Sequence, residues 1–272
     1  MQDSTGYFVE VRRIRDTLKA KLWAGNTSDN DYISGIYASD LMSDVLAYGK
    51  PGSILLTGLN SVQAVISAYM AEFKGVVFLR NKNPGEEILK FAREKGMYVM
   101  STESDMYETC IKLASLESET PDKVQEKDEG HKADNITTHT FTIDGHDFAS
   151  AGMVSTQIKA ILKSIGYDPS IIRRAAISTY EAEMNVVMHA RKAEVTLTAS
   201  DKEIYIIFID EGKGIKDIDL AMKEGYSTAT EEQRALGFGA GMGLPNIKKN
   251  SDYMDIHSVV EVGTRIEITF YI

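Results

Sequence analysis

The chain has 272 residues, of which 43% are hydrophobic and 26% charged, as in globular proteins with one large or two ordinary domains. Its formal net charge of −10 excludes non-specific nucleic-acid binding, which depends on a basic surface. The single cysteine, Cys110, excludes an intrachain disulfide and a metal site built from several cysteines. Because we find neither a secretory leader nor a run of about 18 apolar residues, we expect a cytoplasmic protein that does not enter a membrane.

The N-terminal part alternates between short apolar runs and segments with helical spacing. Strands are predicted where apolar residues run together, and helices where they recur every three or four positions. In chain order, and beginning with a strand, the predicted strands and helices alternate over 52–59, 61–73, 75–80, 84–96, 97–102 and 104–116. Cys110 falls in the last helix, where we expect it to act as a small apolar group. The alternation predicts an α/β layer with a parallel sheet.

A polar and highly charged segment interrupts the chain at roughly 116–138. It contains too few apolar residues to offset the entropy lost on ordering, so we interpret it as a linker. The predicted organisation is an N-terminal domain over 1–116, a linker over 117–136 and a C-terminal domain over 137–272, both domains being of ordinary size.

The C-terminal part has a different order of elements. Gly166 ends a first helix, and Asp168 and Pro169 occupy the N-cap and first-turn positions of a long helix that runs to about Ala190. The other predicted elements are strands 138–145, 193–200, 203–212, 254–261 and 264–272, and helices 148–166, 217–225 and 244–254. Strands 193–200 and 203–212 form a hairpin around 201–202. Helices beside a mainly antiparallel sheet predict an α+β sandwich.

Four glycines alternate with other residues in the segment ALGFGAGMGLPN, residues 235–246. A dinucleotide motif G-x-G-x-x-G beginning at Gly237 needs a third glycine where Met242 stands, and the preceding residues are too polar for a strand. No segment has the G-x-x-x-x-G-K-[ST] spacing of a P-loop. Two interpretations remain: a flexible surface loop, or a phosphate site in which glycines let free N–H groups at a helix start approach the ligand.

The long predicted helix carries the segment STYEAEMNVVMHA. Glu181, Asn185 and His189 are four residues apart and share one face. The neighbouring apolar stripe consists of Ile172, Ala176, Tyr180, Met184 and Val187. A glutamate in this position could accept a proton from a hydroxyl group, and an asparagine oxygen could bind a hard cation. The alternative is an ordinary amphipathic helix with His189 as a helix-end residue.

Two strand ends carry further candidate residues. In IIFIDEGKGI, Asp210 ends an apolar strand and precedes Gly212 and Gly214. A carboxylate there could accept the exocyclic amine of adenine while the glycines let the base lie against the backbone; the alternative is a strand that ends in a turn. In VVEVGTRIEI, Gly263 and Thr264 lead into the last strand, which is also typical of a simple hairpin turn.

The order of these four segments resembles the Bergerat ATP-binding fold (GHKL) of gyrase, Hsp90, histidine kinases and MutL. EAEMN corresponds to the N box, DEGKG to the G1 box, GFGAGMG to the G2 box, and Gly-Thr to the last element. The resemblance covers 137–272. It is greatest to the anti-sigma factor serine/threonine kinases of the RsbW and SpoIIAB type, whose N box has the same Glu-Ala-x-x-Asn pattern.

The resemblance implies a role for each matching residue. Glu181 would be the general base, Asn185 would hold Mg²⁺, and Asp210 would bind the adenine amine with Thr264 beside it. The other residues expected at the nucleotide site are Gly212, Gly214, Gly239, Gly241, Met242, Gly243 and Leu244. The segment 226–240 would form a lid over the phosphates.

The implied function is that of an Mg·ATP-binding signalling regulator that phosphorylates a serine or threonine of a protein partner. The partner would be an antagonist STAS-like protein or a sigma factor, and the chain would form a homodimer through the ATP-binding domain. The alternative is a binding module without catalysis, in which ATP or ADP sets partner affinity in a regulatory or hydrogenase-associated system.

The N-terminal part, about 9–115, resembles a DRTGG-type domain through the segment SGIYASDLMSDVLAYGKPGSILLTGLNSVQAV. Such α/β modules occur beside CBS domains and phosphotransacetylase and in proteins that accompany iron hydrogenases. The sequence Asp-Arg-Thr-Gly-Gly itself is absent, and SGIYASD occupies its place. A regulatory ligand near Thr57, Gly58 and Asn60 would suit an open α/β sheet, while the alternative is that these are ordinary loop residues.

Overall fold

The computed structural model describes residues 9–26, 31–114, 116, 136–230, 234 and 239–272. The chain divides into two compact units, Met1–Lys127 and Asp128–Ile272. Of the predicted linker 117–136, only Ile136 belongs to the described residues.

The N-terminal unit is built on a five-stranded sheet with the order β2-β7-β6-β5-β4. Its strands are β2 (Lys21–Ala24), β4 (Ile36–Ala38), β5 (Ile54–Thr57), β6 (Gly75–Phe78) and β7 (Tyr98–Ser101), and β1 (Val9–Glu10) pairs separately with β3 (Tyr32–Ile33). Neighbouring strands from β4 to β7 are parallel, which confirms the predicted parallel sheet. Strand β2 joins β7 in the antiparallel direction, which makes the sheet mixed.

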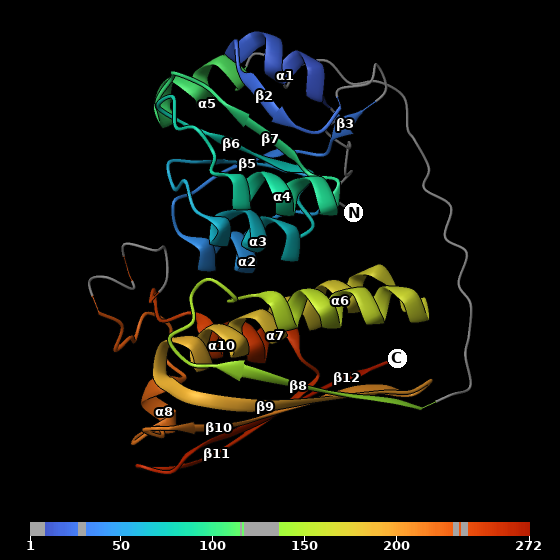
Figure 1. Cartoon of the computed structure of the whole chain (residues 1–272), viewed down its shortest axis with the longest axis vertical. Coiled ribbons are helices and arrows are strands. Elements are labelled where there is room, and N and C mark those ends of the chain that lie inside the picture. The colour runs from blue at the N-terminus through green and yellow to red at the C-terminus, as the bar shows by residue number, and fades with distance from the viewer. Residues whose placement is uncertain (1–8, 27–30, 115, 117–135, 231–233, 235–238) are drawn as a thin grey trace, which may run out of the picture. The chain divides into compact units, whose positions relative to one another are not determined.

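Helices cover both faces of this sheet. They are α1 (Val11–Leu18), α2 (Met42–Tyr48), α3 (Val62–Met70), α4 (Glu86–Lys95) and α5 (Met106–Ala114). Helices α1 and α5 lie on one face, and α2, α3 and α4 lie on the other (Figure 1). Every residue of β5, β6 and β7 is buried, as expected for strands that are covered on both faces. Cys110 packs against the core from α5, as predicted.

The C-terminal unit is a five-stranded antiparallel sheet with the order β11-β12-β10-β9-β8. Its strands are β8 (Thr137–Asp144), β9 (Ala190–Ala199), β10 (Glu203–Gly212), β11 (Tyr253–Val259) and β12 (Gly263–Tyr271). Its helices are α6 (Met153–Ile165), α7 (Pro169–His189), α8 (Ile218–Ala221) and α10 (Gly243–Asn250). Helices α6, α7 and α10 cover one face of the sheet (Figure 1), which confirms the predicted α+β sandwich.

Alternation along the strands builds the core of this unit. Residues of β9, β10 and β12 that face the helices are buried, for example Leu197, Phe208 and Ile268. The predicted apolar stripe of α7 is buried on the other side of the same core. These facing surfaces hold α7 against the sheet and thereby fix the position of every side chain on that helix.

Several predicted helices are longer than the observed ones, among them the helix predicted over 217–225, which is observed as α8 (Ile218–Ala221). Helix α6 begins at Met153 instead of 148, because Gly152 adopts a left-handed conformation with φ of 89° immediately before it. Helix α10 ends at Asn250, because Ser251 is extended and the chain enters β11 at Tyr253. Strand β10 continues through Asp210 to Gly212 against β9, whereas its ladder with β12 ends at Ile209.

Candidate functional site

Helix α7 supplies the first two candidate residues. Its start is fixed by Asp168, whose carboxylate accepts a hydrogen bond from the Ser170 N–H at 2.8 Å, and by Pro169 in the first turn. Glu181 and Asn185 follow one turn apart in the part of the helix that packs against the sheet. Their shared face, predicted from spacing alone, is therefore turned toward the interior of the unit.

Glu181 is a buried carboxyl group that accepts a hydrogen bond from helix α10. It is 7% exposed, and its Oε1 accepts a hydrogen bond from Nδ2 of Asn246 at 2.6 Å. Burial raises the pKa of Glu181 to about 7, against the opposing effect of the Asn246 amide. A carboxyl group that titrates near neutral pH can both accept and release a proton under physiological conditions.

The first turn of α10 lies over Glu181 and Asn185. A Cβ atom placed on Gly243 would lie 3.3 Å from Oδ1 of Asn185 and 3.6 Å from Oε2 of Glu181. The N–H groups of a first helical turn have no acceptor within the helix, and the helix dipole favours an anion there. The N–H groups of Gly243 and Leu244 therefore stand beside an amide and a carboxyl group, an arrangement suited to a phosphate and its counter-ion.

A second polar group lies where β10 meets β12. Oδ1 of Asp210 accepts a hydrogen bond from the Thr264 N–H at 3.1 Å, and the Gly212 N–H is a second donor to the same carboxylate. Burial raises the pKa of Asp210, while these two bonds lower it. Thr264 Oγ1 lies 2.9 Å from Ser258 Oγ, which fixes the hydroxyl beside the carboxylate.

The Asp210 segment meets the C-terminal end of α7. A Cβ atom on Gly212 would lie 3.2 Å from Ala190, the residue that follows His189 at the end of α7. Ala190 is five residues beyond Asn185, which is about 7.5 Å along a helix axis. The Asp210 segment therefore lies near the C-terminal end of the helix that carries Glu181 and Asn185.

Several predicted glycines lie close against other parts of the chain. Gly214 lies against the β11–β12 turn, where its Cβ would be 2.3 Å from the carbonyl oxygen of Val259. Gly239 lies against Ala229, and Gly241, with φ of 72°, lies against Gly225 and Tyr226. The Gly225 N–H donates to the Gly241 carbonyl at 3.1 Å.

Met242 is the residue before α10, and Leu244 is buried in its first turn. The bond between Gly225 and Gly241 brings the two ends of the predicted lid, 226–240, to one place. Gly237 and the other residues of 231–233 and 235–238 lie outside the described residues. The structure thus brings Glu181, Asn185 and Gly243 together, and separately Asp210, Gly212 and Thr264.

Sequence reasoning missed two polar residues. Asn246 is fully buried on α10 and binds Glu181, and its position three residues after the last glycine was the only local signal. Glu183 is 1% exposed and accepts hydrogen bonds from the N–H groups of Gly152, Val154 and Ser155 at 2.8–3.1 Å, so it caps the start of α6. Burial raises its pKa, and the bonds from Ser155, Val154 and Gly152 oppose that effect.

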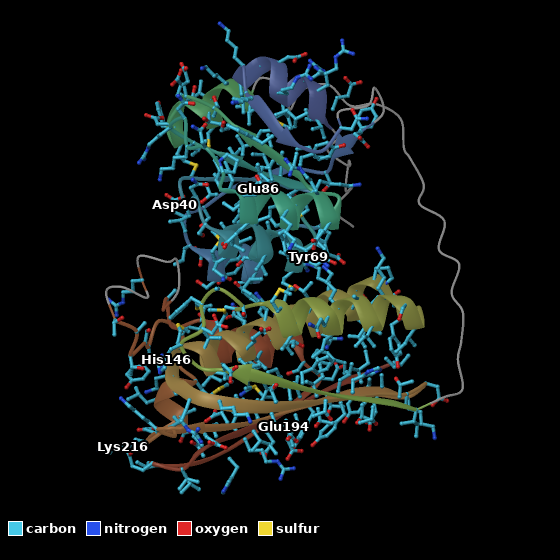
Figure 2. The ribbon with its side chains drawn as sticks, in the orientation of Figure 1. Asp40, Tyr69, Glu86, His146, Glu194 and Lys216 are labelled. Atoms are coloured by element: carbon cyan, nitrogen blue, oxygen red, sulfur yellow. The ribbon has the colours of Figure 1, made fainter. Side chains whose placement is uncertain are left out.

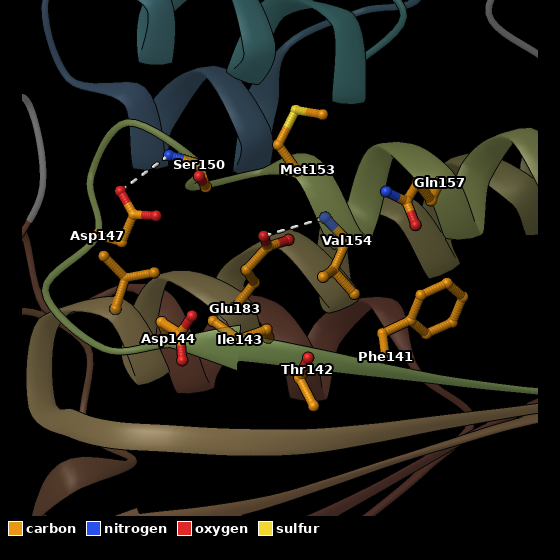
Figure 3. Close-up of a pocket in the computed structure, with 11 residues that line it drawn as sticks. Phe141, Thr142, Ile143, Asp144, Asp147, Ser150, Met153, Val154, Gln157 and Glu183 are labelled. Atoms are coloured by element: carbon orange, nitrogen blue, oxygen red, sulfur yellow. Dashed lines mark hydrogen bonds between the residues drawn. The ribbon is translucent and has the colours of Figure 1, made fainter.

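A pocket of about 390 Å³ lies between β8 and the start of α6, next to Glu183 (Figure 3). Both polar and apolar residues line the pocket: Phe141, Thr142, Ile143, Asp144, Asp147, Ser150, Met153, Val154, Gln157, Glu183 and Val187. None of the predicted site residues lines it. This pocket is therefore distinct from the site on the other face of α7.

In the N-terminal unit, Asp40, which follows β4 and is labelled in Figure 2, binds polar groups at the carboxyl end of β5. Oδ1 of Asp40 accepts hydrogen bonds from Thr57 Oγ1 at 2.8 Å and from the Gly58 N–H at 2.6 Å. Nδ2 of Asn60 donates to the Asn83 carbonyl at 2.8 Å. The three predicted residues thus lie at the edge of the sheet and are engaged in bonds within the unit.

Two general properties complete the description. Among the residues that the structure describes, no helix is both long enough and apolar enough to cross a membrane. The same residues contain no group of three or more histidine, cysteine or acidic side chains placed to hold a metal ion.

The antiparallel sheet, the Glu–Asn pair on its long helix and the glycine-led helix above that pair define an ATP-binding domain of the histidine kinase and gyrase class. A family model for "Histidine kinase-, DNA gyrase B-, and HSP90-like ATPase" matches residues 176–272, and a model for the DRTGG domain matches residues 13–116. The chain therefore belongs to the family of these ATPases, with the anti-sigma F factors among its relatives, and carries a DRTGG domain before the ATPase domain.

Curated relatives match the ATPase half. The anti-sigma F factor of Caldanaerobacter subterraneus subsp. tengcongensis is 37% identical over 112 residues, which are 39% of this chain and 75% of the relative. The serine/threonine-protein kinase RsbT of Bacillus subtilis is 29% identical over 111 residues, which are 39% of this chain and 77% of RsbT.

Among solved structures, the CBS and DRTGG domains of the regulatory region of Clostridium perfringens pyrophosphatase, in complex with diadenosine tetraphosphate, align with a TM-score of 0.36 and 17% identity. That alignment covers 40% of this chain and 47% of the pyrophosphatase chain. The match to the ATPase family implies that the C-terminal domain binds ATP.

Proposed function

We propose that the protein is an Mg·ATP-dependent serine/threonine protein kinase of the anti-sigma factor type, which acts on a protein partner. The observation that carries this proposal is the buried Glu181 beside Asn185, directly under the first turn of α10. A buried carboxyl group with a pKa of about 7 suits the removal of a proton from a hydroxyl group during phosphoryl transfer.

In the proposed reaction, Glu181 is the general base. Oε1 is bound by Asn246, so the proton of the serine or threonine hydroxyl passes to Oε2, the oxygen that faces Gly243. The hydroxyl oxygen forms a bond to the γ-phosphorus of ATP as the bond from that phosphorus to the β,γ-bridging oxygen breaks, which releases ADP. N–H groups of Gly243 and Leu244 stabilise the phosphate oxygens.

The residues present also suit a magnesium ion. The Asn185 amide oxygen is a hard ligand beside the helix start, and Mg²⁺ needs only one or two protein ligands because waters and phosphates complete its coordination. Asn185 would hold this ion, which when bound offsets the negative charge of the phosphates.

The remaining contacts are assigned to the nucleoside and the loop. Asp210 accepts the adenine amine, with Thr264 beside it, and the other lining residues are Gly212, Gly214, Gly239, Gly241, Met242, Gly243 and Leu244. A carboxylate held by two backbone N–H groups is oriented before a ligand arrives, which lowers the cost of binding.

The proposed partner is an antagonist STAS-like protein or a sigma factor, as the relationship to anti-sigma F factors suggests. The N-terminal domain, proposed as 1–116 and joined through a linker over 117–136 to the ATPase domain over 137–272, would regulate the kinase or dock its partner. A homodimer formed through the ATPase domain belongs to the same proposal.

The test is phosphoryl transfer from γ-labelled ATP to candidate STAS-domain proteins by the full chain. We expect label on a serine or threonine of one candidate with the wild-type protein, and a loss of at least a hundredfold in rate with Glu181→Gln. Intact ATP binding without transfer to any candidate that binds the chain would contradict the kinase proposal.

A second candidate is a switch in which ATP or ADP sets partner affinity without catalysis. The hydrogen bond between Gly225 and Gly241 favours it, because it ties the base of the predicted lid to the glycines that precede α10. In the same assay, partner affinity that differs between ATP and ADP without any transfer of label would support this alternative.

A further inference from the structure

We propose that Asn246 is a positioning residue, which orients the Glu181 carboxyl group and links its environment to the position of helix α10. This inference rests on the proposed role of Glu181 as the general base. In this proposal, the hydrogen bond from Asn246 determines which carboxylate oxygen of Glu181 faces the substrate.

The contact between the two side chains is short and shielded from water. Nδ2 of Asn246 lies 2.6 Å from Oε1 of Glu181, with Asn246 fully buried and Glu181 7% exposed. Rotation of the Glu181 carboxyl group would break this bond in a place where water cannot replace it, so the bond fixes the carboxyl plane. Oε2 is thereby held toward Gly243.

The backbone of Asn246 is fixed as well. Its N–H donates to the Met242 carbonyl at 2.8 Å, and its carbonyl accepts from Nδ2 of Asn250 at 2.8 Å. Arg174 of α7 donates from Nε to the Asn250 carbonyl at 2.9 Å and pairs with Asp252 at 2.6 Å. Helix α10 is thus attached to α7 near both of its ends.

Helix α10 lies against α7 so that two residues of α10 reach the Glu181–Asn185 pair. Gly243, at the start of α10, lies over Asn185, and Asn246, one turn later, reaches Glu181. The N–H groups offered to the phosphate and the donor offered to the base therefore move as one helix. A shift of α10 changes the phosphate contact and the environment of Glu181 together.

The chemistry of the amide suits this task. It stabilises the ionised carboxylate through one hydrogen bond and adds no charge, so burial can still hold the pKa near neutral. Burial and the Asn246 amide are the two influences on that pKa among the described residues. The α10 residues Lys248 and Lys249 are exposed, and the other buried carboxyl group of α7, Glu183, is bound to the start of α6.

The experiment follows the Glu181 carboxyl carbon by NMR in the full chain labelled with ¹³C at glutamate Cδ, without nucleotide, with Glu181→Gln to assign the signal. We expect Asn246→Ala to raise the Glu181 titration midpoint by about one pH unit, which is a tenfold lower carboxylate fraction below the midpoint. Asn246→Asp, which keeps the shape and removes the donor, should raise it further because the new charge also opposes ionisation.

Lys248→Ala is the control, because Lys248 is exposed on the same helix, two residues after Asn246. It should leave the midpoint within about 0.2 pH unit of the wild type. The acidic limb of the pH–rate profile for phosphoryl transfer should move upward with the NMR midpoint in both Asn246 variants, while ATP affinity changes less than about threefold.

An unchanged Glu181 midpoint in both Asn246 variants, or an equal shift in Lys248→Ala, would overturn the positioning role. The NMR titration needs no phosphoryl transfer, so it separates this outcome from a failure of the kinase proposal. A shifted midpoint together with a wild type that never transfers phosphate would support the contact and reject catalysis by Glu181.

Discussion

Glu181 is the residue on which the account depends most. Burial outweighs the hydrogen bond from the Asn246 amide and raises the pKa of Glu181 to about 7, so its charged form is disfavoured below that pH. Active sites commonly carry such perturbed groups, because a base must titrate near the working pH to be effective. Asp210 shows the same effect in a milder form, with two backbone N–H groups offsetting its burial.

The raised pKa has a consequence for stability. Glu181 titrates at about 7 in the folded protein and near 4.5 when unfolded, so the folded state binds this proton more tightly. Its stabilising contribution is complete below about pH 4.5 and is lost as the pH rises through 7.

We predict that Glu181→Gln stabilises the ATPase domain at pH 8.5 by roughly 1–3 kcal/mol relative to the wild type, and that this advantage shrinks toward pH 5. Hydrogen exchange of α7 and β10 amides measures the unfolding free energy of this unit separately from the other. The control is Glu194→Gln, because Glu194 is exposed on β9 (Figure 2). Identical pH dependence in the two variants would contradict the buried ionisation.

At the scale of elements, α7 organises the whole C-terminal unit. One face carries Glu181 and Asn185 toward α10, its end meets the Asp210 segment, and another face sends Glu183 to the start of α6. Glu183 replaces the capping side chain that Gly152 cannot provide, because glycine has none.

We predict that Glu183→Ala lowers the unfolding free energy of the ATPase domain by about 2–4 kcal/mol, since three buried N–H groups lose their acceptor. Amide exchange at the first turn of α6 should accelerate most. Glu194→Ala, which removes an exposed carboxylate, should change the free energy by less than about 0.5 kcal/mol. A loss in Glu183→Ala no larger than in this control would show that the cap contributes little.

The elements and local motifs could be predicted from the sequence, whereas the contacts between distant segments could not. Spacing on one helix placed Glu181 with Asn185, and alternation placed Phe208 and Ile268 in the core. The partner of Glu181 is 65 residues away, and nothing in the local pattern of LPNIKKN indicates that its asparagine turns inward. The cap by Glu183 depends on a similar long-range contact.

The short strands β1 to β4 were not predicted from the sequence either. Strands β1 to β4 have two to four residues, too few for a period of two to stand out, and β2 adds an antiparallel edge to a sheet whose other neighbours are parallel. The helix predicted from 148 begins at Met153, because the left-handed conformation of Gly152 interrupts a segment with helical spacing.

On the scale of the whole molecule, the chain joins a DRTGG domain to an ATPase domain related to anti-sigma F factors. The DRTGG domain places Asp40 and Thr57 at the carboxyl edge of its sheet, where ligands bind in open α/β folds. The ATPase domain carries the proposed chemistry, so the proposed order of events runs from a signal at the first domain to phosphoryl transfer at the second.

The most direct test of the central claim is isothermal titration of Mg·ATP into the full-length wild type, Asn185→Ala and Glu181→Gln. We expect Asn185→Ala to weaken Mg·ATP binding by at least tenfold, and Glu181→Gln to bind within about threefold of the wild type but to be inactive in transfer. Binding by Asn185→Ala at wild-type strength, or an equal loss in both variants, would contradict it.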